Sequence, residues 1–248
     1  MADSAGDSGD VSRETAASDV SRETESPDPI ILTELVPPQR LGLLEEYAES
    51  LATDGVTRGL IGPREVPRLW DRHLVNCALL SPLIAPGVSV ADIGSGAGLP
   101  GVVIAIARPD LRVTLIEPMA RRVAFLEEVR GRLGLDGLEV VRARAEQWSG
   151  GRTFDVVTAR AVASLPKLLG WAMPLVSAEG ALLAMKGSSA AAEIEAASGD
   201  LRRWHARAEV VSSSVPGSSV TTVVRVVRGP AAGIGWESSR TRRRQRQR

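Results

Sequence analysis

The chain has 248 residues with 30 basic and 30 acidic side chains, so its overall charge points to no particular class of partner. One cysteine and two histidines exclude an internal disulfide and the common zinc patterns, so we expect no metal and a reducing compartment. No apolar run approaches the ~18 residues of a membrane span, and the acidic N-terminus does not resemble a signal peptide. The sequence therefore predicts a cytoplasmic protein with no membrane partner.

The two ends of the chain carry opposite charge. Residues 1–29 contain eight acids, two arginines and almost no large apolar side chain, so we predict a disordered acidic tail. The last nine residues contain six arginines and no acid, and we predict a second disordered tail over 230–248. This Arg-rich tail could attract RNA phosphates or simply be solvated, and the sequence does not separate the two.

The acidic tail contains a duplication, in which Asp10–Thr15 recurs as Asp19–Thr24. One interpretation is a short interaction motif in two copies. Another is selection on the DNA, because Val-Ser-Arg-Glu-Thr can be encoded by the palindrome GTTTCACGTGAAAC plus one base, and this palindrome resembles the sites of chromosome-partitioning proteins. The codons of the gene decide between them.

Ordered structure is expected from about Ile30 onward. Residues 39–53 place Leu41, Leu44, Ala48 and Leu51 on one face at helical spacing, and residues 67–80 form a second amphipathic pattern. We therefore predict an N-terminal helical extension over residues 30–86. His73 lies in the second helix, where a structural histidine is more common than a catalytic one.

The central motif is Val88–Gly101, an apolar run followed by alternating Gly94, Gly96 and Gly98. This pattern predicts a buried strand, a tight glycine turn and a helix. Glycines at this spacing let backbone amides approach a ligand closely.

Two ligand classes fit the turn. Residues 96–101 match G-x-G-x-x-G, and Glu117 follows where a ribose-binding acid belongs, so a dinucleotide is one candidate. Asp92, at the end of the strand, would repel a pyrophosphate and attract an ammonium or sulfonium centre. S-adenosylmethionine carries both cations and no phosphate, and this second candidate is favoured.

After the turn, strands and helices alternate. Strands are predicted over 111–116, 138–141, 154–158, 181–185, 210–214 and 221–227, with helices over 119–133, 165–176 and 190–204. The alternation predicts an α/β fold over residues 87–229, with a doubly wound, mostly parallel seven-stranded sheet. The Asp92 and glycine loop resembles that of the usual S-adenosylmethionine-dependent methyltransferase sheet. The final hairpin supplies an antiparallel edge strand.

Polar residues recur where these strands end, and the carboxyl ends of parallel strands meet at one edge of the sheet. We therefore expect one site containing Asp92, Glu117, Glu146, Arg160 and Lys186. Glu117 ends its strand and can accept hydrogen bonds from both ribose hydroxyls. The turn that contains Glu146 is equally compatible with an adenine site and with an ordinary surface turn. No nucleophile accompanies Arg160 and Lys186, so they are expected to bind and orient a polar or anionic substrate.

These stretches resemble the small-subunit ribosomal RNA guanine-N7 methyltransferases, the glucose-inhibited division protein B family, over residues 35–228. The matching stretches are Asp71–Leu74, Asp92–Gly101, Arg122–Leu126, Ala159–Leu165 and Lys186-Gly187. The chain differs from many relatives at Thr221-Thr222, where they carry a basic residue before the last strand.

The resemblance implies S-adenosylmethionine as cofactor and 16S ribosomal RNA, free or in a ribosomal particle, as partner. To the cofactor-binding residues that the motif and strand ends indicate, Asp92, Gly96, Gly98 and Glu117, it adds these implied cofactor contacts: Gly94, Leu99, Ala145, Glu146 and Arg160. It also implies that His73, Arg160 and Lys186 line the reaction and RNA side.

Methylation of guanine N7 requires no general base, because N7 has a lone pair and no proton, which agrees with this set of residues. Three alternatives stay open from the residues alone. An NAD-dependent oxidoreductase would use Gly96, Gly98, Gly101 and Glu117, but it lacks an obvious Tyr–Lys acid pair. The other two are a methyltransferase for a small molecule or protein and a non-catalytic RNA-binding module.

Overall fold

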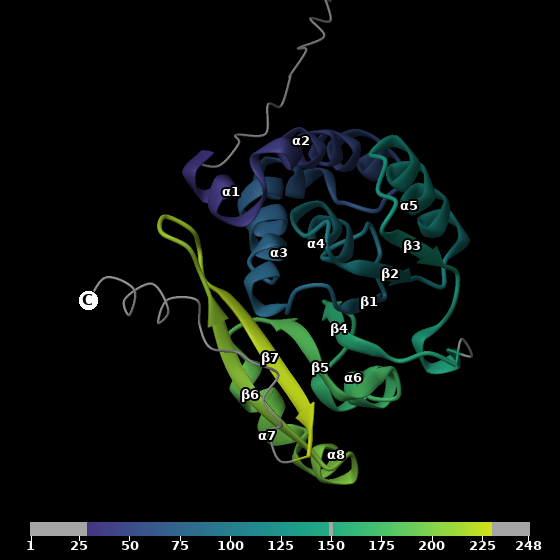
Figure 1. The fold of residues 1–248 in the computed structure, drawn as a ribbon, viewed down its shortest axis with the longest axis vertical. Coiled ribbons are helices and arrows are strands. Elements are labelled where there is room, and N and C mark those ends of the chain that lie inside the picture. Colours follow the sequence, from purple (N-terminus) through teal and green to yellow (C-terminus); the bar gives the residue numbers. More distant parts are fainter. Residues whose placement is uncertain (1–28, 149–150, 230–248) are drawn as a thin grey trace, which may run out of the picture.

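The computed structural model describes residues 29–148 and 151–229 (Figure 1). The duplicated motif and the Arg-rich tail lie outside the described residues. The first described helix, α1 (Pro29–Leu35), begins close to the predicted start of order at Ile30.

Seven strands form one sheet in the order β3-β2-β1-β4-β5-β7-β6. Their bounds are β1 (Ser89–Ile93), β2 (Arg112–Ile116), β3 (Leu138–Val141), β4 (Phe154–Arg160), β5 (Val176–Lys186), β6 (Ala206–Ser213) and β7 (Thr221–Arg228). The first five strands are parallel, and β7 runs antiparallel to both β5 and β6. The predicted doubly wound sheet with an antiparallel margin is confirmed.

One face of the sheet packs against α4 (Gly101–Ala107), α5 (Ala120–Arg132) and the N-terminal segment. The N-terminal segment comprises α1, η1 (Pro38–Arg40), α2 (Leu41–Ser50), η2 (Leu51–Gly55), η3 (Pro63–Arg68), η4 (Leu69–Val75), α3 (Asn76–Ala78) and η5 (Ser81–Leu83). Its apolar side chains share one buried cluster with α4 and the sheet, so the predicted helical extension is part of the main core.

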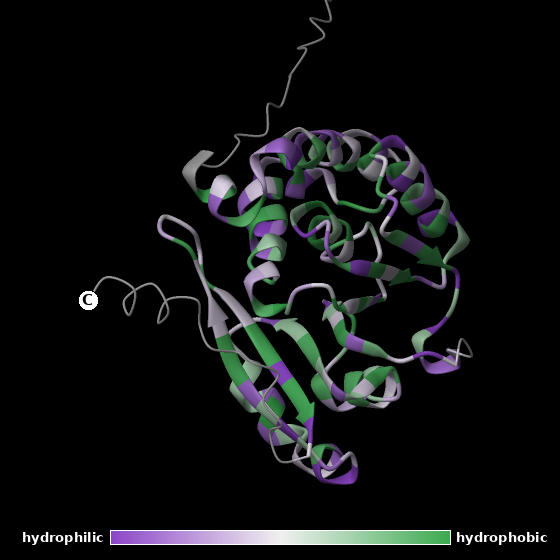
Figure 2. Ribbon diagram, in the orientation of Figure 1, coloured by the Kyte–Doolittle hydropathy of each residue, from purple (hydrophilic) through white to green (hydrophobic). Residues whose placement is uncertain are grey.

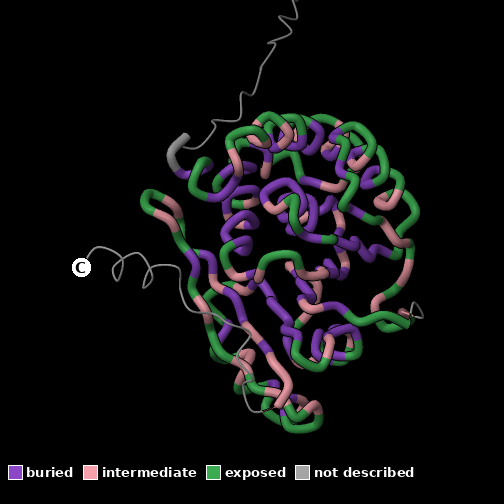
Figure 3. The backbone as a smooth tube through the Cα atoms, in the orientation of Figure 1, coloured by how far each residue is buried: buried purple, intermediate pink, exposed green. Residues whose placement is uncertain are grey.

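The other face packs against α6 (Leu165–Ala172), α7 (Ala190–Ala196) and α8 (Ser198–Arg203). Figure 2 shows apolar residues concentrated in the strands. Figure 3 shows the central strands buried beneath helices with exposed outer faces, whereas β6 at the margin of the sheet is largely exposed or half-buried. Within the described ranges, every helix is too short or too polar to cross a lipid bilayer.

Two predicted boundaries are wrong. The strand predicted over 210–214 begins at Ala206, because residues 206–209 already pair with β7. The other concerns Val176. Residues up to Val176 were expected in a helix, but α6 ends at Ala172 and β5 begins at Val176. The reason is that Val176 pairs with Phe154 at the start of β4, so the β-branched side chain extends the sheet.

Candidate functional site

The glycine turn lies where β1 ends, between that strand and α4. Gly94, Gly96 and Gly98 all have positive φ angles of 66°, 60° and 103°, a region that L side chains rarely adopt. A Cβ atom on Gly98 would lie 2.5 Å from Val102 Cγ2, whereas one on Gly96 would meet nothing nearer than 3.8 Å. The turn is therefore closely packed at Gly98 and open at Gly96.

Asp92 lies behind this turn rather than on its open side. Its side chain is fully buried, and Oδ2 accepts a hydrogen bond from the Gly101 amide (3.0 Å) at the start of α4. Oδ1 accepts a second from Thr158 Oγ1 (3.2 Å) on β4. Burial raises the pKa of Asp92 to about 7 in spite of these donors. The carboxyl group thus joins β1, β4 and α4.

Glu117 is the acid that contacts the open part of the turn. Its Oε2 accepts a hydrogen bond from the Gly96 amide (2.9 Å), and its Oε1 accepts one from the Met119 amide (3.0 Å). The residue is fully buried, with Arg122 Nη1 3.6 Å from Oε2. A carboxylate therefore lies against the glycine turn, as predicted from the sequence, but it is Glu117 and not Asp92 that contacts the loop amide.

The N-terminal segment contacts the same turn through Tyr47. Its buried hydroxyl donates to the Ala97 carbonyl (2.8 Å), and burial raises the pKa of the phenol well above its usual value. A Cβ on Gly98 would lie 2.8 Å from this hydroxyl. Sequence reasoning did not identify Tyr47, because only its place in a helix could be predicted.

Arg160 ends β4 and contacts the N-terminal segment. Its Nη1 donates to Cys77 Sγ (3.3 Å), and its Nη2 donates to the Arg72 carbonyl (3.3 Å) and to His73 Nδ1. On the other ring nitrogen, His73 Nε2 lies 2.9 Å from Glu65 Oε2. The structure thus brings His73 and Arg160 into direct contact and adds Glu65, which the sequence analysis did not single out.

Lys186 ends β5, and its side chain is 11% exposed. Its Nζ donates to the Ala163 carbonyl (2.7 Å) and to Glu193 Oε2 (2.7 Å), which also accepts the Leu165 amide (2.8 Å). Burial opposes ionisation of Glu193, but these hydrogen bonds lower its pKa. The charge of Lys186 is therefore paired within the protein.

A cleft of about 620 Å³ lies at the ends of β4 and β5. The residues that line it include Asn76, Arg160, Lys186, Glu193, Val220 and Thr222. Two predicted site residues, Arg160 and Lys186, thus line the same cavity, and the divergent Thr221-Thr222 pair borders it. Thr221 Oγ1 donates to the Asn76 carbonyl (3.1 Å), which connects β7 to the N-terminal segment.

The glycine turn lies beside the segment that follows Arg160. Val162 follows Arg160 by two residues, and a Cβ on Gly94 would lie 3.0 Å from its Cγ2. Ala145 and Glu146 form the short helix η6 (Ala145–Gln147) after β3, where Glu146 is exposed and 3.7 Å from Arg144. The carboxyl-terminal edge therefore presents the turn, Glu117 and the cleft along one side of the sheet.

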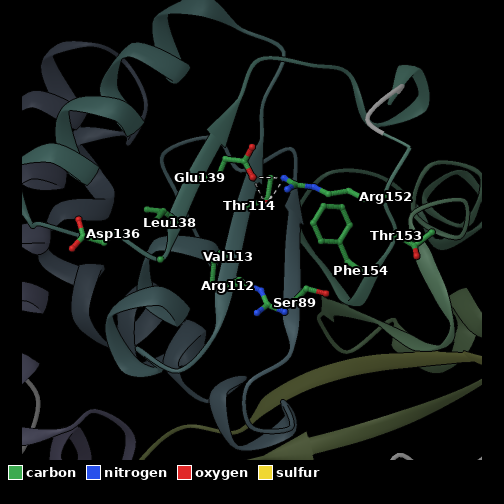
Figure 4. A pocket seen from close by; sticks show the side chains of 11 residues that line it. Ser89, Arg112, Val113, Thr114, Asp136, Leu138, Glu139, Arg152, Thr153 and Phe154 are labelled. Carbon is green, nitrogen blue, oxygen red and sulfur yellow. Dashed lines mark hydrogen bonds and ion pairs between the residues drawn. The ribbon is translucent and has the colours of Figure 1, made fainter.

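A second cavity of about 430 Å³ lies at the opposite edge, where the strands begin (Figure 4). Arg152 and Glu139 point toward one another there and form an ion pair, with Thr114 Oγ1 3.2 Å from Arg152 Nη2. Arg152 and Glu139 thus neutralise one another, and no predicted site residue lines this cavity. Among the residues that the structure describes, no group of acids, histidines and cysteine could hold a metal ion.

Comparisons with known proteins agree with this geometry. A family model described as rRNA small subunit methyltransferase G matches residues 40–219. A Nocardioides protein named "Ribosomal RNA small subunit methyltransferase G" is 57% identical over 237 residues, covering 95% of this chain and 91% of that protein. One with the same name from Thermobifida fusca is 53% identical over 208 residues, covering 82% and 87%.

Solved structures show the same fold at low identity. A methyltransferase from Pyrococcus furiosus has a TM-score of 0.50 and 14% identity, covering 61% of this chain and 80% of that chain. Trm5b from Pyrococcus abyssi has a TM-score of 0.50 and 11% identity, covering 68% and 50%.

Proposed function

The chain belongs to the GidB family, the small-subunit ribosomal RNA methyltransferases G, and we propose that it transfers a methyl group from S-adenosylmethionine to N7 of a guanine in 16S ribosomal RNA. The observation that carries the proposal is that the glycine turn lies beside the segment after Arg160, where a Cβ on Gly94 would lie 3.0 Å from Val162 Cγ2. This position supports a cofactor site at the turn, next to the strand end whose Arg160 side chain lines the cleft.

The residues of the turn fit the cofactor. Three positive-φ glycines present bare backbone, and the position at Gly96 is open. Glu117 has one amide on each carboxylate oxygen, and each oxygen keeps a second lone pair, which a ribose hydroxyl could use. We propose that Gly94, Gly96, Leu99 and Glu117 hold the cofactor, and that Ala145-Glu146 lies beside its adenine.

The role proposed for Asp92 is structural support of this loop. Its carboxyl group holds the start of α4 through Gly101 rather than a ligand. Glu117 takes over the electrostatic preference for a cationic ligand, because it contacts the loop amide and a nearby diphosphate would be repelled by it. This preference and the family membership both oppose the dinucleotide alternative.

The bound cofactor supplies an electrophilic methyl group on a sulfonium centre. Guanine N7 offers a lone pair and no proton, so the protein has to align the base and exclude water rather than remove a proton. Arg160 can donate to guanine O6 or to a phosphate, and a planar guanidinium suits either acceptor. Lys186 holds the turn after Arg160 through the Ala163 carbonyl.

The proposed substrate is a guanine within a structured RNA and not a free nucleotide. A base inside a structured RNA must leave its stack to reach the cleft, which suits a single-stranded or splayed guanine. Because its substrate is ribosomal RNA, we propose that the enzyme works in the cytoplasm.

Calorimetry and methyl transfer test the proposal together. The purified protein should bind S-adenosylmethionine and not NAD, and should transfer labelled methyl to small-subunit particles or to 16S RNA that lack the modification. Nucleoside analysis should then recover 7-methylguanosine. Binding of RNA without transfer would instead support the non-catalytic module, and transfer only to a small molecule or a protein would contradict the RNA substrate.

A further inference from the structure

Arg160 differs from Lys186, the other cationic residue that lines the cleft, in the kind of acceptors that hold it. Its partners are a backbone carbonyl, a neutral imidazole nitrogen and a thiol, contributed by Arg72, His73 and Cys77. Burial raises the pKa of the Cys77 thiol to about 11, so this partner is uncharged at neutral pH. Over residues 29–148 and 151–229, no carboxylate forms an ion pair with Arg160.

A comparison with Lys186 shows that the charge of Arg160 is not neutralised by a carboxylate. Glu193 neutralises Lys186 at 2.7 Å, whereas Arg160 is fixed in place with its charge uncompensated by a carboxylate. A guanidinium held by neutral acceptors keeps its full attraction for phosphate or for the electron-rich edge of guanine. The acceptors therefore orient Arg160 without competing for its charge.

His73 can fill this role in only one protonation state. Because Arg160 donates to Nδ1, that nitrogen must be bare, and the proton of the neutral ring must be on Nε2. Glu65 Oε2 lies 2.9 Å from Nε2 and accepts this proton in a hydrogen bond. The arrangement is thus a chain from Glu65 through His73 to Arg160.

We propose that Glu65 and His73 are positioning residues for the methyl-transfer reaction: Glu65 fixes the tautomer of His73, and His73 holds Arg160 toward the RNA substrate. The inference rests on the proposed function, because it assumes that Arg160 contacts the RNA. Neither residue touches the reacting atoms.

The charged groups that face the His73 ring come from three elements: Glu65 from η3, Arg72 from η4 and Arg160 from β4. Burial and the Arg160 charge lower the pKa of His73, although Glu65 opposes this, which favours the neutral ring that the Arg160 contact requires. Protonation at acid pH puts a hydrogen on Nδ1 facing the guanidinium. The Arg160 contact is then lost, and methylation should fall on the acid side.

Two isosteric variants separate the two ring nitrogens. The amide of His73→Asn stands near the Nδ1 position and can still accept from Arg160, whereas the amide of His73→Gln stands near Nε2 and reaches Glu65 instead. We expect kcat/KM for methylation of small-subunit particles to fall about 10- to 100-fold in His73→Gln, in the range for a misplaced substrate contact. His73→Asn should be at least about tenfold more active than His73→Gln and should lack the acid limb of the pH profile.

Glu65 is tested in the same way. Glu65→Gln keeps an oxygen that can accept from Nε2, and loss of the carboxylate should move the acid limb to lower pH. Glu65→Ala removes control of the tautomer and should resemble His73→Gln. His205→Asn, which removes the other histidine at a positive-φ position far from the cleft, should leave the acid limb where it is.

Binding of S-adenosylmethionine and the thermal midpoint report on folding in every variant. Equal losses in His73→Asn and His73→Gln, or an acid limb that persists in His73→Asn, would overturn the inference. The proposed function has a separate test: if Arg160→Ala methylates like the wild type, the role of Arg160 is wrong. If Arg160→Ala is impaired while His73→Gln and Glu65→Ala are not, only the positioning inference fails.

Discussion

Replacing Asp92 with asparagine should stabilise the protein relative to the wild type, and this gain should be larger at neutral pH than at acid pH. The carboxyl group is fully buried, and its pKa is about 7 instead of 3.8. The difference corresponds to about 4 kcal/mol of unfolding free energy. Because the pKa is raised in the folded state, this contribution is present in full below about pH 4 and is lost as the pH rises through 7.

Asparagine can satisfy both existing partners. Its carbonyl oxygen can accept the Gly101 amide, and its amide can donate to Thr158 Oγ1, which can turn to donate to the Ala91 carbonyl, now 3.4 Å away. The variant should therefore fold, and its stability should not include the cost of ionising a buried acid. The gap between Asp92→Asn and the wild type should widen by up to about 4 kcal/mol from pH 4 to pH 7.5.

Urea unfolding followed by tryptophan fluorescence at several pH values in this range measures the gap. Asp155→Asn is the matched control with the opposite sign. Hydrogen bonds from Ser89 lower the pKa of Asp155, so the wild type should gain on this variant as the pH rises from acid values. A gap for Asp92→Asn that does not change with pH would refute the reasoning.

Three further variants test the loop and the cleft. Tyr47→Phe removes a buried hydrogen bond to the loop and should cost about 1–2 kcal/mol in urea unfolding while weakening S-adenosylmethionine binding by calorimetry; unchanged binding would contradict the loop contact. Gly98→Ala should cost roughly 3 kcal/mol or more, because it adds a close contact to backbone strain, whereas Gly96→Ala should cost only about 1 kcal/mol; equal thermal midpoints would refute this ranking. Lys186→Met should cost about 1–3 kcal/mol in urea unfolding, and adding Glu193→Gln should restore part of it; additive losses would show that the pair does not interact.

The architecture could be predicted from the sequence because hydrophobic periodicity determines it. The apolar run before the glycine turn identified β1, the alternation after Gly101 identified the other six strands, and the carboxyl-end rule grouped Arg160 and Lys186, which line one cleft. The error at Val176 arose because β5 gains its first residues from pairing with β4 across a bulge. Such pairing is a tertiary effect that a local pattern does not contain.

Side-chain direction within the site could not be predicted. Strand position placed Asp92 beside the turn, but not the inward rotation toward Gly101 that leaves Glu117 on the loop amide. Nor does any sequence spacing bring His73 to Arg160, because the two residues are 87 positions apart and meet only when η4 packs beside β4. Contacts of this kind depend on the packing of whole elements.

The most direct test of the account is the position of the new methyl group on 16S ribosomal RNA. Treatment of the product with borohydride and then aniline cleaves the chain at 7-methylguanine. We expect one enzyme-dependent cleavage within the small-subunit RNA. With Arg160→Ala this cleavage should be strongly reduced, although the variant should still bind S-adenosylmethionine. A methyl group recovered on an exocyclic nitrogen or a ribose, with no such cleavage, would contradict it.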